Sequence, residues 1–236
     1  AGLGLTRGII EKSLCFPELN SLYRQTMAIS RQAPALSFTR RALQAMNVTW
    51  KVRASEENPF PAAGPVVVVA NHPFGGIEGM LLLALLEPFR RDVKVLANYL
   101  LARLPEMRDN FIFVDPFGFA RSARVNVRPL RQALAWLCEG HVLGVFPAGE
   151  VSSVDIRTGQ VRDPAWSPSV AAIVRRTQAT VVPVFFAGHN GPLFNLAGML
   201  HPRLRTLMLP QQLVNKRNRE LSVQIGRAIA WREMTE

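Results

Sequence analysis

The stretch that most constrains the fold is a β-branched run, Val66 to Ala70, followed by Asn-His-Pro-Phe-Gly-Gly and then by the apolar segment Ile77 to Leu86. The run is bounded by Pro65 and predicts a buried strand, whereas the later segment is typical of a core helix. The proline and glycines between them interrupt both patterns. This order places His72 and Glu78 at one fixed corner between two core elements.

Short apolar runs of the same kind recur along the chain and alternate with helical patterns. We expect strands at 48–52, 66–70, 93–97, 111–114, 142–146, 181–186 and 221–225. We expect helices that start at 77 and that cover 99–104, 126–138 and 168–176, weak helical character at 193–200, a basic helix or loop at 213–219, and polar loops at 56–64 and 155–165. This alternation predicts an α/β fold, a single domain with a mostly parallel central sheet flanked by helices.

In such a sheet the ligand site lies at the carboxyl ends of the parallel strands. Four residues each follow a predicted strand: His72, Asp115, Pro147 and Gly188. The fold class therefore predicts that these four residues line one rim of the sheet.

Residues 1–47 form an N-terminal amphipathic helical segment in this prediction. Apolar side chains recur at helical spacing between residues 5 and 46, in two or three short helices interrupted by Pro17 and Pro34. A segment that lies on a membrane surface and an ordinary helical layer over the sheet explain this pattern equally well. Residues 48–236 then form the main domain, which is long enough for one sizeable hydrophobic core.

The chain is strongly basic, with a formal net charge of +11 and a pI near 11.1. Such a charge requires an anionic partner or surface. Arginine is spread from end to end and is not concentrated on a recognition element, which favours an anionic membrane surface over nucleic acid. The longest aliphatic stretch, Met80 to Leu86, is far shorter than the ~20 residues of a membrane-spanning helix.

Several familiar sites are missing from the sequence. It has no Gly-x-Ser-x-Gly elbow, no phosphate-binding loop that ends in Gly-Lys-Ser/Thr and no His-Glu-x-x-His pair. The remaining histidines, His141, His189 and His201, are scattered, so we expect no metal site. Cys15 and Cys138 lie far apart in apolar company, and we expect both to be free core thiols.

The corner residues have the chemistry of a general base and its partner. A histidine can take a proton from a hydroxyl group while a carboxylate holds its other ring nitrogen. Gly75 and Gly76 let the backbone turn sharply enough for Glu78 to meet His72, and they leave backbone amides at a helix amino terminus for a developing oxyanion. The alternative is a buried histidine that only satisfies a local hydrogen bond; the glycines and the acid favour the base.

A second segment, Gly144 to Ser153, joins a predicted strand to a loop with an acid and two hydroxyl groups. Such a loop is suited to binding a polar head group, although a simple strand-ending turn would show the same proline and glycine. Its candidate binding residues are Phe146, Pro147, Gly149, Glu150, Ser152 and Ser153.

Together these segments resemble the PlsC-like glycerolipid and lysophospholipid acyltransferase family, more particularly its bacterial branch of hemolysin-named and ornithine-lipid-type members. The family's Asn-His-x-x-x-x-Asp motif is similar to residues 71–78, its Phe-Pro-Glu-Gly-Thr-Arg-Ser motif to residues 146–152, and its Val-Pro-Val strand to Val182-Pro183-Val184. The likeness covers about residues 48 to 230 and keeps the motifs in the family's order.

The resemblance implies an O-acyltransferase in which His72 removes the proton from an acceptor hydroxyl and Glu78 orients His72. The acyl group comes from a thioester of acyl carrier protein or coenzyme A, with no other cofactor and no metal. The implied location is peripheral, on the cytoplasmic face of a bacterial inner membrane. The implied substrate-binding residues are Asn71, Gly75, Gly76, Asp115, Arg121, Arg124, Phe146, Pro147, Gly149, Glu150, Ser152 and Ser153.

The chain departs from the family motifs at three places. Its acid is a glutamate one residue further along, Val151 replaces the motif arginine, and the arginine expected after the third strand has no clear counterpart, although Arg121 and Arg124 follow. Because arginine binds phosphate through two parallel hydrogen bonds, its loss favours a lyso-lipid with an amino-acid head group, such as lyso-ornithine lipid, over lysophosphatidic acid, with other lysophospholipids left open. Two alternatives remain: a lipid-binding relative without catalysis, and a thioesterase-like hydrolase.

Overall fold

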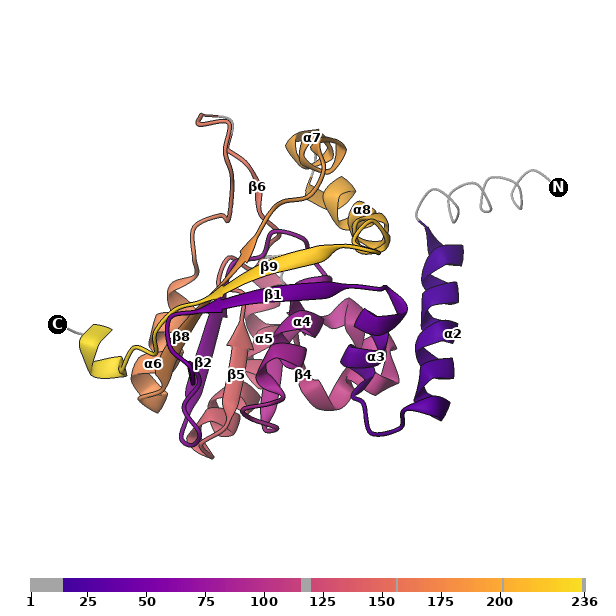
Figure 1. The fold of residues 1–236 in the computed structure, drawn as a ribbon. Helices are drawn as coiled ribbons and strands as arrows, with labels where there is room; N and C mark the ends of the chain where they lie inside the picture. Colours follow the sequence, from indigo (N-terminus) through magenta and orange to yellow (C-terminus); the bar gives the residue numbers. More distant parts are fainter. Residues whose placement is uncertain (1–14, 116–119, 156, 201, 235–236) are drawn as a thin grey trace.

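The computed structural model describes residues 15–115, 120–155, 157–200 and 202–234, with the side chains of residues 100, 120–124, 198–200 and 202–203 left aside. Its main feature is a seven-stranded sheet (Figure 1). In spatial order the strands are β1 (Thr49–Ala54), β9 (Glu220–Ile225), β8 (Thr180–Ala187), β2 (Val66–Ala70), β5 (Val142–Val145), β3 (Val93–Asn98) and β4 (Phe111–Val114).

The five strands from β8 to β4 run parallel, β9 runs antiparallel to β8, and β1 pairs with β9 in parallel. This confirms the α/β fold with a mostly parallel sheet. The helices are α2 (Phe16–Gln32), α3 (Phe38–Ala45), α4 (Ile77–Leu86), α5 (Ala120–Cys138), α6 (Pro168–Thr177), α7 (Pro192–Leu200) and α8 (Pro202–Val214), with 3₁₀ turns at Tyr99–Arg103, Pro105–Asn110 and Trp231–Met234.

The central strand β2 is buried on both faces, which explains its continuous valine run. Val66 and Val68 belong to the core cluster that contains α3 and α4. Val67 and Val69 belong to a second cluster with side chains of α5 and α6. The sheet is therefore covered by helices on both faces, as its parallel strands require.

Helix α4 packs closely on the sheet because β5 has a glycine beneath it. A Cβ atom on Gly144 would lie 2.7 Å from Leu82 and 3.0 Å from Val95. All ten residues of α4 are buried, Glu78 among them. The first turn of α4, which carries this carboxylate, is therefore held in a rigid part of the molecule.

The N-terminal helices pack on the rest of the domain. Leu22 of α2 and Leu43 of α3 are buried in the core, and Ser37 caps α3 by accepting a hydrogen bond from the Arg40 amide. Residues 1–14 of the expected helical segment lie outside the described residues.

Two local predictions were wrong, and most of one helix was not predicted. The segment 155–165 is not only loop, because β6 (Ser153–Val154) and β7 (Val161–Arg162) form a short antiparallel hairpin around it. The segment 213–219, expected to be a basic helix or loop, is the end of α8 followed by a turn, whereas the rest of α8 was not predicted; its Pro202 occupies the first helical position, where proline is tolerated. Helix α5 begins before residue 126, at Ala120.

The two cysteines are free, as predicted, but they are not core residues. Cys138 is exposed because it occupies the outer face at the last turn of α5, opposite the buried Leu137. Cys15 is only partly buried, at the start of α2.

Two asparagines from distant parts of the chain contact each other just before β1 and β9 begin. Asn47 and Asn218 both have left-handed backbone conformations, with φ of 50° and 55°. The Asn47 side-chain amide donates to the Asn218 side-chain oxygen at 2.9 Å, and the Asn218 backbone amide donates to Met46. This contact precedes the parallel pairing of β1 with β9, where Thr49 faces Glu220.

The Arg90 guanidinium links several loops at the amino ends of the central strands. It donates two hydrogen bonds to Asp92, at 2.8 and 2.5 Å, and others to backbone carbonyls of Pro61, Gly64 and Gly140. Asp92 also contacts His141 Nδ1 at 2.9 Å. We call Arg90, Asp92 and His141 the Arg90 cluster.

Candidate active site

His72 and Glu78 meet at the carboxyl end of β2. His72 Nδ1 lies 3.4 Å from Glu78 Oε1, a contact within ion-pair range that falls short of a well-formed hydrogen bond. The His72 side chain is 18% exposed, whereas that of Glu78 is fully buried. The histidine is therefore reachable from outside, and its carboxylate partner lies beneath it.

Two backbone amides hold Glu78 in place. Phe74 N–H and Gly75 N–H both donate to Glu78 Oε1, at 2.5 and 3.0 Å. Burial by itself raises the pKa of Glu78, but the attraction of His72 and these amide hydrogen bonds outweigh it, so the net pKa is lowered. Glu78 is thus an ionised carboxylate directed at His72.

The use of the Gly75 amide differs from the sequence-based expectation. That amide was expected to face a developing oxyanion, but here it donates to Glu78. Gly75 has a positive φ of 110°, and a Cβ atom on it would lie 2.6 Å from Leu209 Cδ2. A Cβ on Gly76 would meet no heavy atom within 4 Å. Gly75 therefore must be a glycine, both because of its positive φ and because a side chain there would clash with Leu209, whereas Gly76 faces neither constraint.

The second sequence segment forms the opposite wall of the corner. The Phe146 ring stacks on the His72 ring with centroids 4.4 Å apart. The backbone N–H of Ser152 donates to the His72 carbonyl at 2.9 Å. The loop from Phe146 to Ser152 therefore contacts the histidine at its ring and at its backbone.

Asp163, which directly follows β7, hydrogen-bonds to both His72 and the loop that contacts it. Its carboxylate accepts hydrogen bonds from His72 N–H at 3.2 Å, Ser152 Oγ at 2.5 Å and Trp166 Nε1 at 3.1 Å. The sequence analysis missed this residue, because a single aspartate in a polar stretch gives no signal. The Ser152 hydroxyl donates a hydrogen bond to Asp163, so its role here is to hold the loop in place.

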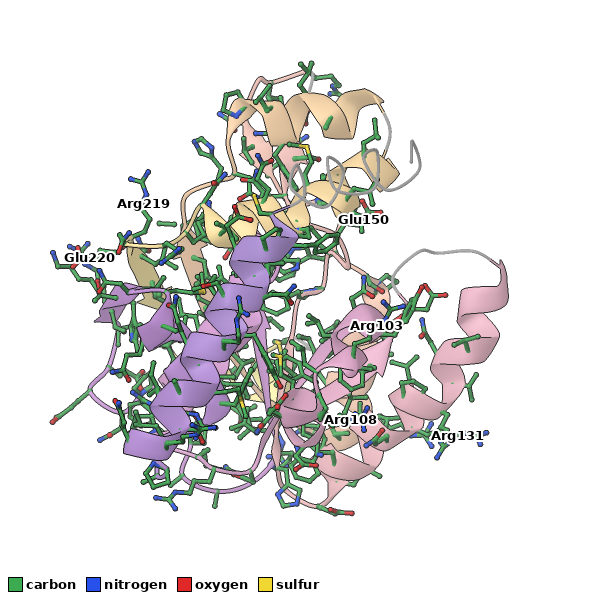
Figure 2. The ribbon with its side chains drawn as sticks, turned by 90° about the vertical axis from the view of Figure 1, so that its right-hand side faces the viewer. Arg103, Arg108, Arg131, Glu150, Arg219 and Glu220 are labelled. Carbon is green, nitrogen blue, oxygen red and sulfur yellow. The ribbon has the colours of Figure 1, made fainter. Side chains whose placement is uncertain are left out.

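Helix α8 and the residues after it close the site on the side opposite the sheet. Arg205, a buried residue of α8, pairs with Glu150 at 2.5 Å; Figure 2 labels Glu150 just below α7 and α8. Lys216 places its ammonium 4.3 Å from the centroid of the Phe74 ring. Burial lowers the pKa of Lys216, and the carboxylate of Glu78 opposes this shift. Neither Arg205 nor Lys216 was predicted from the sequence.

Several predicted site residues lie in the scaffold or apart from His72. The Asn71 side chain bridges β2 to β8, donating to the Phe186 carbonyl and accepting from its amide, at 2.9 and 2.7 Å. Asp115 follows β4, three strands from β2 and so about 14 Å away along the sheet. Its backbone is hydrogen-bonded to Asn126 of α5.

The remaining predicted residues are placed as follows. Pro147 is buried and its carbonyl accepts from Ser167 N–H, Gly149 forms an exposed turn with a positive φ of 67°, and Ser153 begins β6. Arg121 and Arg124 belong to α5, but their side chains lie outside the described ones.

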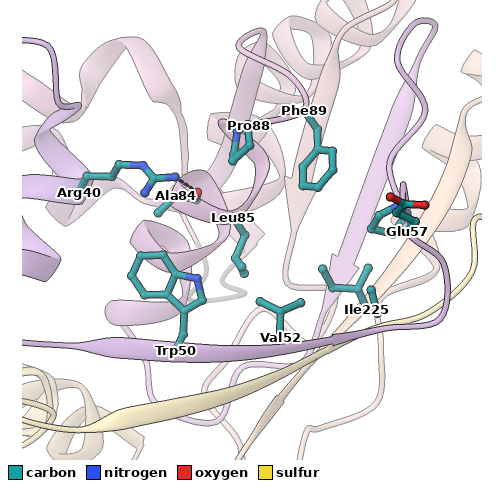
Figure 3. A pocket seen from close by; sticks show the side chains of 11 residues that line it. Arg40, Trp50, Val52, Glu57, Ala84, Leu85, Pro88, Phe89 and Ile225 are labelled. Atoms are coloured by element: carbon teal, nitrogen blue, oxygen red, sulfur yellow. Dashed lines mark hydrogen bonds between the residues drawn. The ribbon is translucent and has the colours of Figure 1, made fainter.

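Two hollows accompany the site. One, of about 490 Å³, lies at the β6–β7 hairpin and is lined in part by Ser153, Arg162 and Asp163. An apolar one of about 390 Å³ lies between β1 and the end of α4, where Trp50, Leu85 and Phe89 line it (Figure 3). The hollow at the hairpin shares Asp163 with the histidine corner, and neither His72 nor Glu78 lines either hollow.

Within the described part of the chain, no group of three histidine, cysteine or acidic side chains is arranged to hold a metal ion. The same residues contain no helix that is long and apolar enough to cross a membrane.

The arrangement has the geometry of a histidine base with a carboxylate partner, as in enzymes that transfer a group. A buried carboxylate faces Nδ1 of a reachable histidine, which leaves Nε2 to take a proton from a substrate hydroxyl. An acyltransferase family model matches residues 24–235, and the chain belongs to this PlsC-like acyltransferase family.

Named relatives and a solved structure agree with this assignment. The chain is 24% identical over 209 residues to the lyso-glycine lipid O-acyltransferase of Phocaeicola vulgatus, a match that covers 86% of this chain and 72% of that protein. The enzyme of the same name from Bacteroides thetaiotaomicron is also 24% identical over 209 residues, with 86% and 74% covered. The crystal structure of PlsC, a 1-acyl-sn-glycerophosphate acyltransferase from Thermotoga maritima, has the same fold, with a TM-score of 0.53 and 20% identity over 100% of this chain and 79% of that one.

Proposed function

We propose that this acyltransferase moves a fatty acyl group from a thioester of acyl carrier protein or coenzyme A to the hydroxyl of a lyso-lipid. The observation that carries the proposal is the contact between His72 and the buried, ionised Glu78 at the carboxyl end of β2. A carboxylate that faces Nδ1 stabilises the imidazolium that forms when Nε2 takes up a proton.

The proposed reaction needs no covalent enzyme intermediate. His72 Nε2 takes the proton from the acceptor hydroxyl, and the hydroxyl oxygen forms a bond to the thioester carbonyl carbon. The carbon–sulfur bond then breaks, and the departing thiolate takes the proton from His72. The engagement of the Ser152 hydroxyl with Asp163 supports this scheme, because that hydroxyl is not directed at His72 as a nucleophile would be.

We propose an amino-acid lyso-lipid as the acceptor class. Val151 stands where the family motif has its arginine, so this loop offers no guanidinium for a phosphate. The two named relatives are lyso-glycine lipid O-acyltransferases, which supports a head group of this kind. The hollow beside Asp163 has hydroxyl and carboxylate groups in its lining, and its guanidinium, that of Arg162, pairs with Asp155. Lyso-ornithine lipid belongs to the same chemical class.

The test supplies the purified protein with acyl-carrier-protein or acyl-coenzyme A thioesters and with lyso-glycine lipid, lyso-ornithine lipid or lysophosphatidic acid. Free thiol and acylated lipid are both measured. We expect equal amounts of thiol and acylated amino-acid lipid, with little product from lysophosphatidic acid. Thiol release without acylated lipid would identify a hydrolase, and bound lipid without thiol release would identify a lipid-binding relative.

A His72→Ala protein tests the base directly. We expect its acyl-transfer rate to fall by about 10²–10⁴-fold, the usual contribution of a general base. His189→Ala is the matched control, because this exposed histidine follows β8 and its Nδ1 lies 2.8 Å from the carbonyl oxygen of the adjacent Asn190. A His72→Ala protein as active as the parent would overturn the mechanism.

The charge of +11 supports action at an anionic membrane surface, which we propose to be the cytoplasmic face of the inner membrane of a bacterium. The exposed arginines lie far apart on the molecule, as Arg131 and Arg219 illustrate in Figure 2. Such a spread suits a diffuse attraction to lipid head groups.

A further inference from the structure

Helices α7 and α8 form a hairpin between β8 and β9 that projects from the sheet at the top of Figure 1. Its inner side contacts the active-site corner: Leu209 Cδ2 lies against Gly75, and Arg205 pairs with Glu150. The hairpin is therefore joined to the site both by apolar packing and by an ion pair.

The outer side of the hairpin exposes leucines. On α7, Leu193 is 71% exposed and Leu196 is 54% exposed; on α8, Leu204 is 43% and Leu207 is 54% exposed. Each pair is three residues apart, so the two members share one helix face. We call these four residues the leucine face. Four large apolar side chains exposed on one hairpin indicate a surface that contacts an apolar partner.

The stretch of chain that carries the leucine face is basic. No acidic residue occurs between Asp163 and Glu220, whereas this stretch contains the basic residues Arg175, Arg176, Arg203, Arg205, Lys216, Arg217 and Arg219. Arg217 and Arg219 are exposed directly after α8. An exposed apolar face on a basic stretch, followed by the exposed Arg217 and Arg219, is complementary to the interface of an anionic lipid bilayer.

We propose that the leucine face lies in the interface of an anionic bilayer and brings the active-site corner to the lipid surface. The inference rests on the proposed function in one respect, because contact with a bilayer would serve the enzyme only if its acceptor is a lipid. A bilayer contact at this hairpin also suits the site. A lipid acceptor held in the membrane at the leucine face would lie close to His72 and Glu78 on the inner side of the hairpin.

The test measures partition of the full chain into sedimented vesicles of phosphatidylcholine alone or mixed with phosphatidylglycerol. The variant Leu193→Gln/Leu207→Gln removes two exposed leucines without changing the net charge. Val125→Gln/Val127→Gln is the matched control, because these valines of α5 are 51% and 45% exposed. We expect the leucine variant to partition about tenfold more weakly into the anionic vesicles and the valine variant to match the parent.

A second comparison covers the N-terminal segment. Met27 of α2 is 37% exposed, so Met27→Gln tests whether α2 carries the contact instead. Thermal unfolding of each variant establishes that it is folded. Equal partition of the parent and the leucine variant would overturn the proposal, as would a larger loss for Met27→Gln. Light scattering that shows a dimer in the parent and a monomer in the leucine variant would assign the face to a second copy and overturn it as well.

Failure of this proposal and failure of the proposed function are separable. Acyl transfer by the parent to an acceptor dispersed in detergent tests the function without any bilayer. Partition that depends on the leucines, together with no transfer to any acceptor, would leave the membrane contact standing and refute the function. Transfer in detergent with leucine-independent partition would do the reverse.

Discussion

Glu78 contacts His72 although it lies one residue further along the chain than the acid of the family motif. The structure shows how: Gly75 adopts a positive φ, and the amides of Phe74 and Gly75 turn toward the carboxylate. The turn shortens the path from the histidine to the first turn of α4. The charge and the length of Glu78 should therefore both matter.

Substituting Glu78 separates these two properties. Glu78→Gln keeps the side-chain length but removes the charge that stabilises the imidazolium, so we expect a fall in kcat of about 10²–10⁴-fold. Glu78→Asp keeps the charge but withdraws it from the amides, and we expect an intermediate loss. Steady-state kinetics with a fixed thioester would measure both. A Glu78→Gln protein with the parent kcat would contradict the assigned role.

The two neighbouring glycines provide a matched pair. Gly75→Ala forces a Cβ into a left-handed backbone position and to 2.6 Å from Leu209, so we expect it to lower both activity and thermal stability, the latter by about 1–3 kcal/mol. Gly76→Ala places its Cβ in open space at a φ of −83° and should unfold at nearly the parent temperature. Equal effects of the two substitutions would show that the close approach to Leu209 is unimportant.

At the level of single residues, the sequence indicated the pairing of His72 with Glu78, because two glycines between a histidine and an acid make a tight corner. It could not indicate Asp163, Arg205 or Lys216. These residues reach the corner from a hairpin, from α8 and from the turn after α8, and their placement depends on tertiary packing that no local pattern records.

Among the elements, the β6–β7 hairpin has the most direct link to the corner. It positions Asp163, whose carboxylate accepts hydrogen bonds from the His72 backbone amide, the Ser152 hydroxyl and the Trp166 indole. Its strands have only two residues each, too short for an alternating pattern, which is why the segment was predicted to be a loop. The hairpin positions the histidine without supplying a catalytic residue.

Substitutions of Asp163 test this positioning role. Asp163→Asn retains an oxygen that can accept from His72 N–H and the Ser152 hydroxyl, so we expect it to keep much of the parent activity. Asp163→Ala leaves these donors unpaired, which costs about 1–3 kcal/mol, and we expect kcat to fall by at least tenfold. The intrinsic fluorescence of Trp166 should change in both variants. Unchanged kcat in Asp163→Ala would mean that the corner holds its geometry without the hairpin.

Across the whole molecule, the carboxyl ends of the central strands carry the active-site corner, while the Arg90 cluster ties the loops at their amino ends. The alternation of strands and helices was sufficient to predict the fold class. The spatial order of the strands was not predictable, because the pairing of β1 with β9 depends on contacts between the two ends of the domain.

The Arg90 cluster should make stability depend on pH in the acid range. Hydrogen bonding to Arg90 and, more weakly, to His141 lowers the pKa of Asp92 to about 2 against an opposing effect of burial. In the unfolded chain an aspartate titrates near ~3.9, so the stabilisation is complete above about pH 5 and is lost as the pH falls through 2. Because the Asp92 side chain is 29% exposed, we expect a contribution of only about 1–2 kcal/mol.

Urea unfolding of the parent and of Asp92→Asn at pH 6 and pH 3 would measure this contribution. The variant should be less stable than the parent at pH 6, and the difference should shrink at pH 3. A difference that stays constant between the two pH values would rule out ionised Asp92 as its source.

The asparagine contact at the sheet edge has a consequence for how the chain assembles. Asn47 and Asn218 are 171 residues apart, and the pairing that follows them joins β1 to β9 alone. During synthesis the chain emerges from its amino end, and contacts across long separations form slowly. The corner that holds His72 and Glu78 lies on strands that can pair before β9 is available. Although β1 is the first strand of the sheet in sequence, it is therefore the last to pair, because its partner is β9.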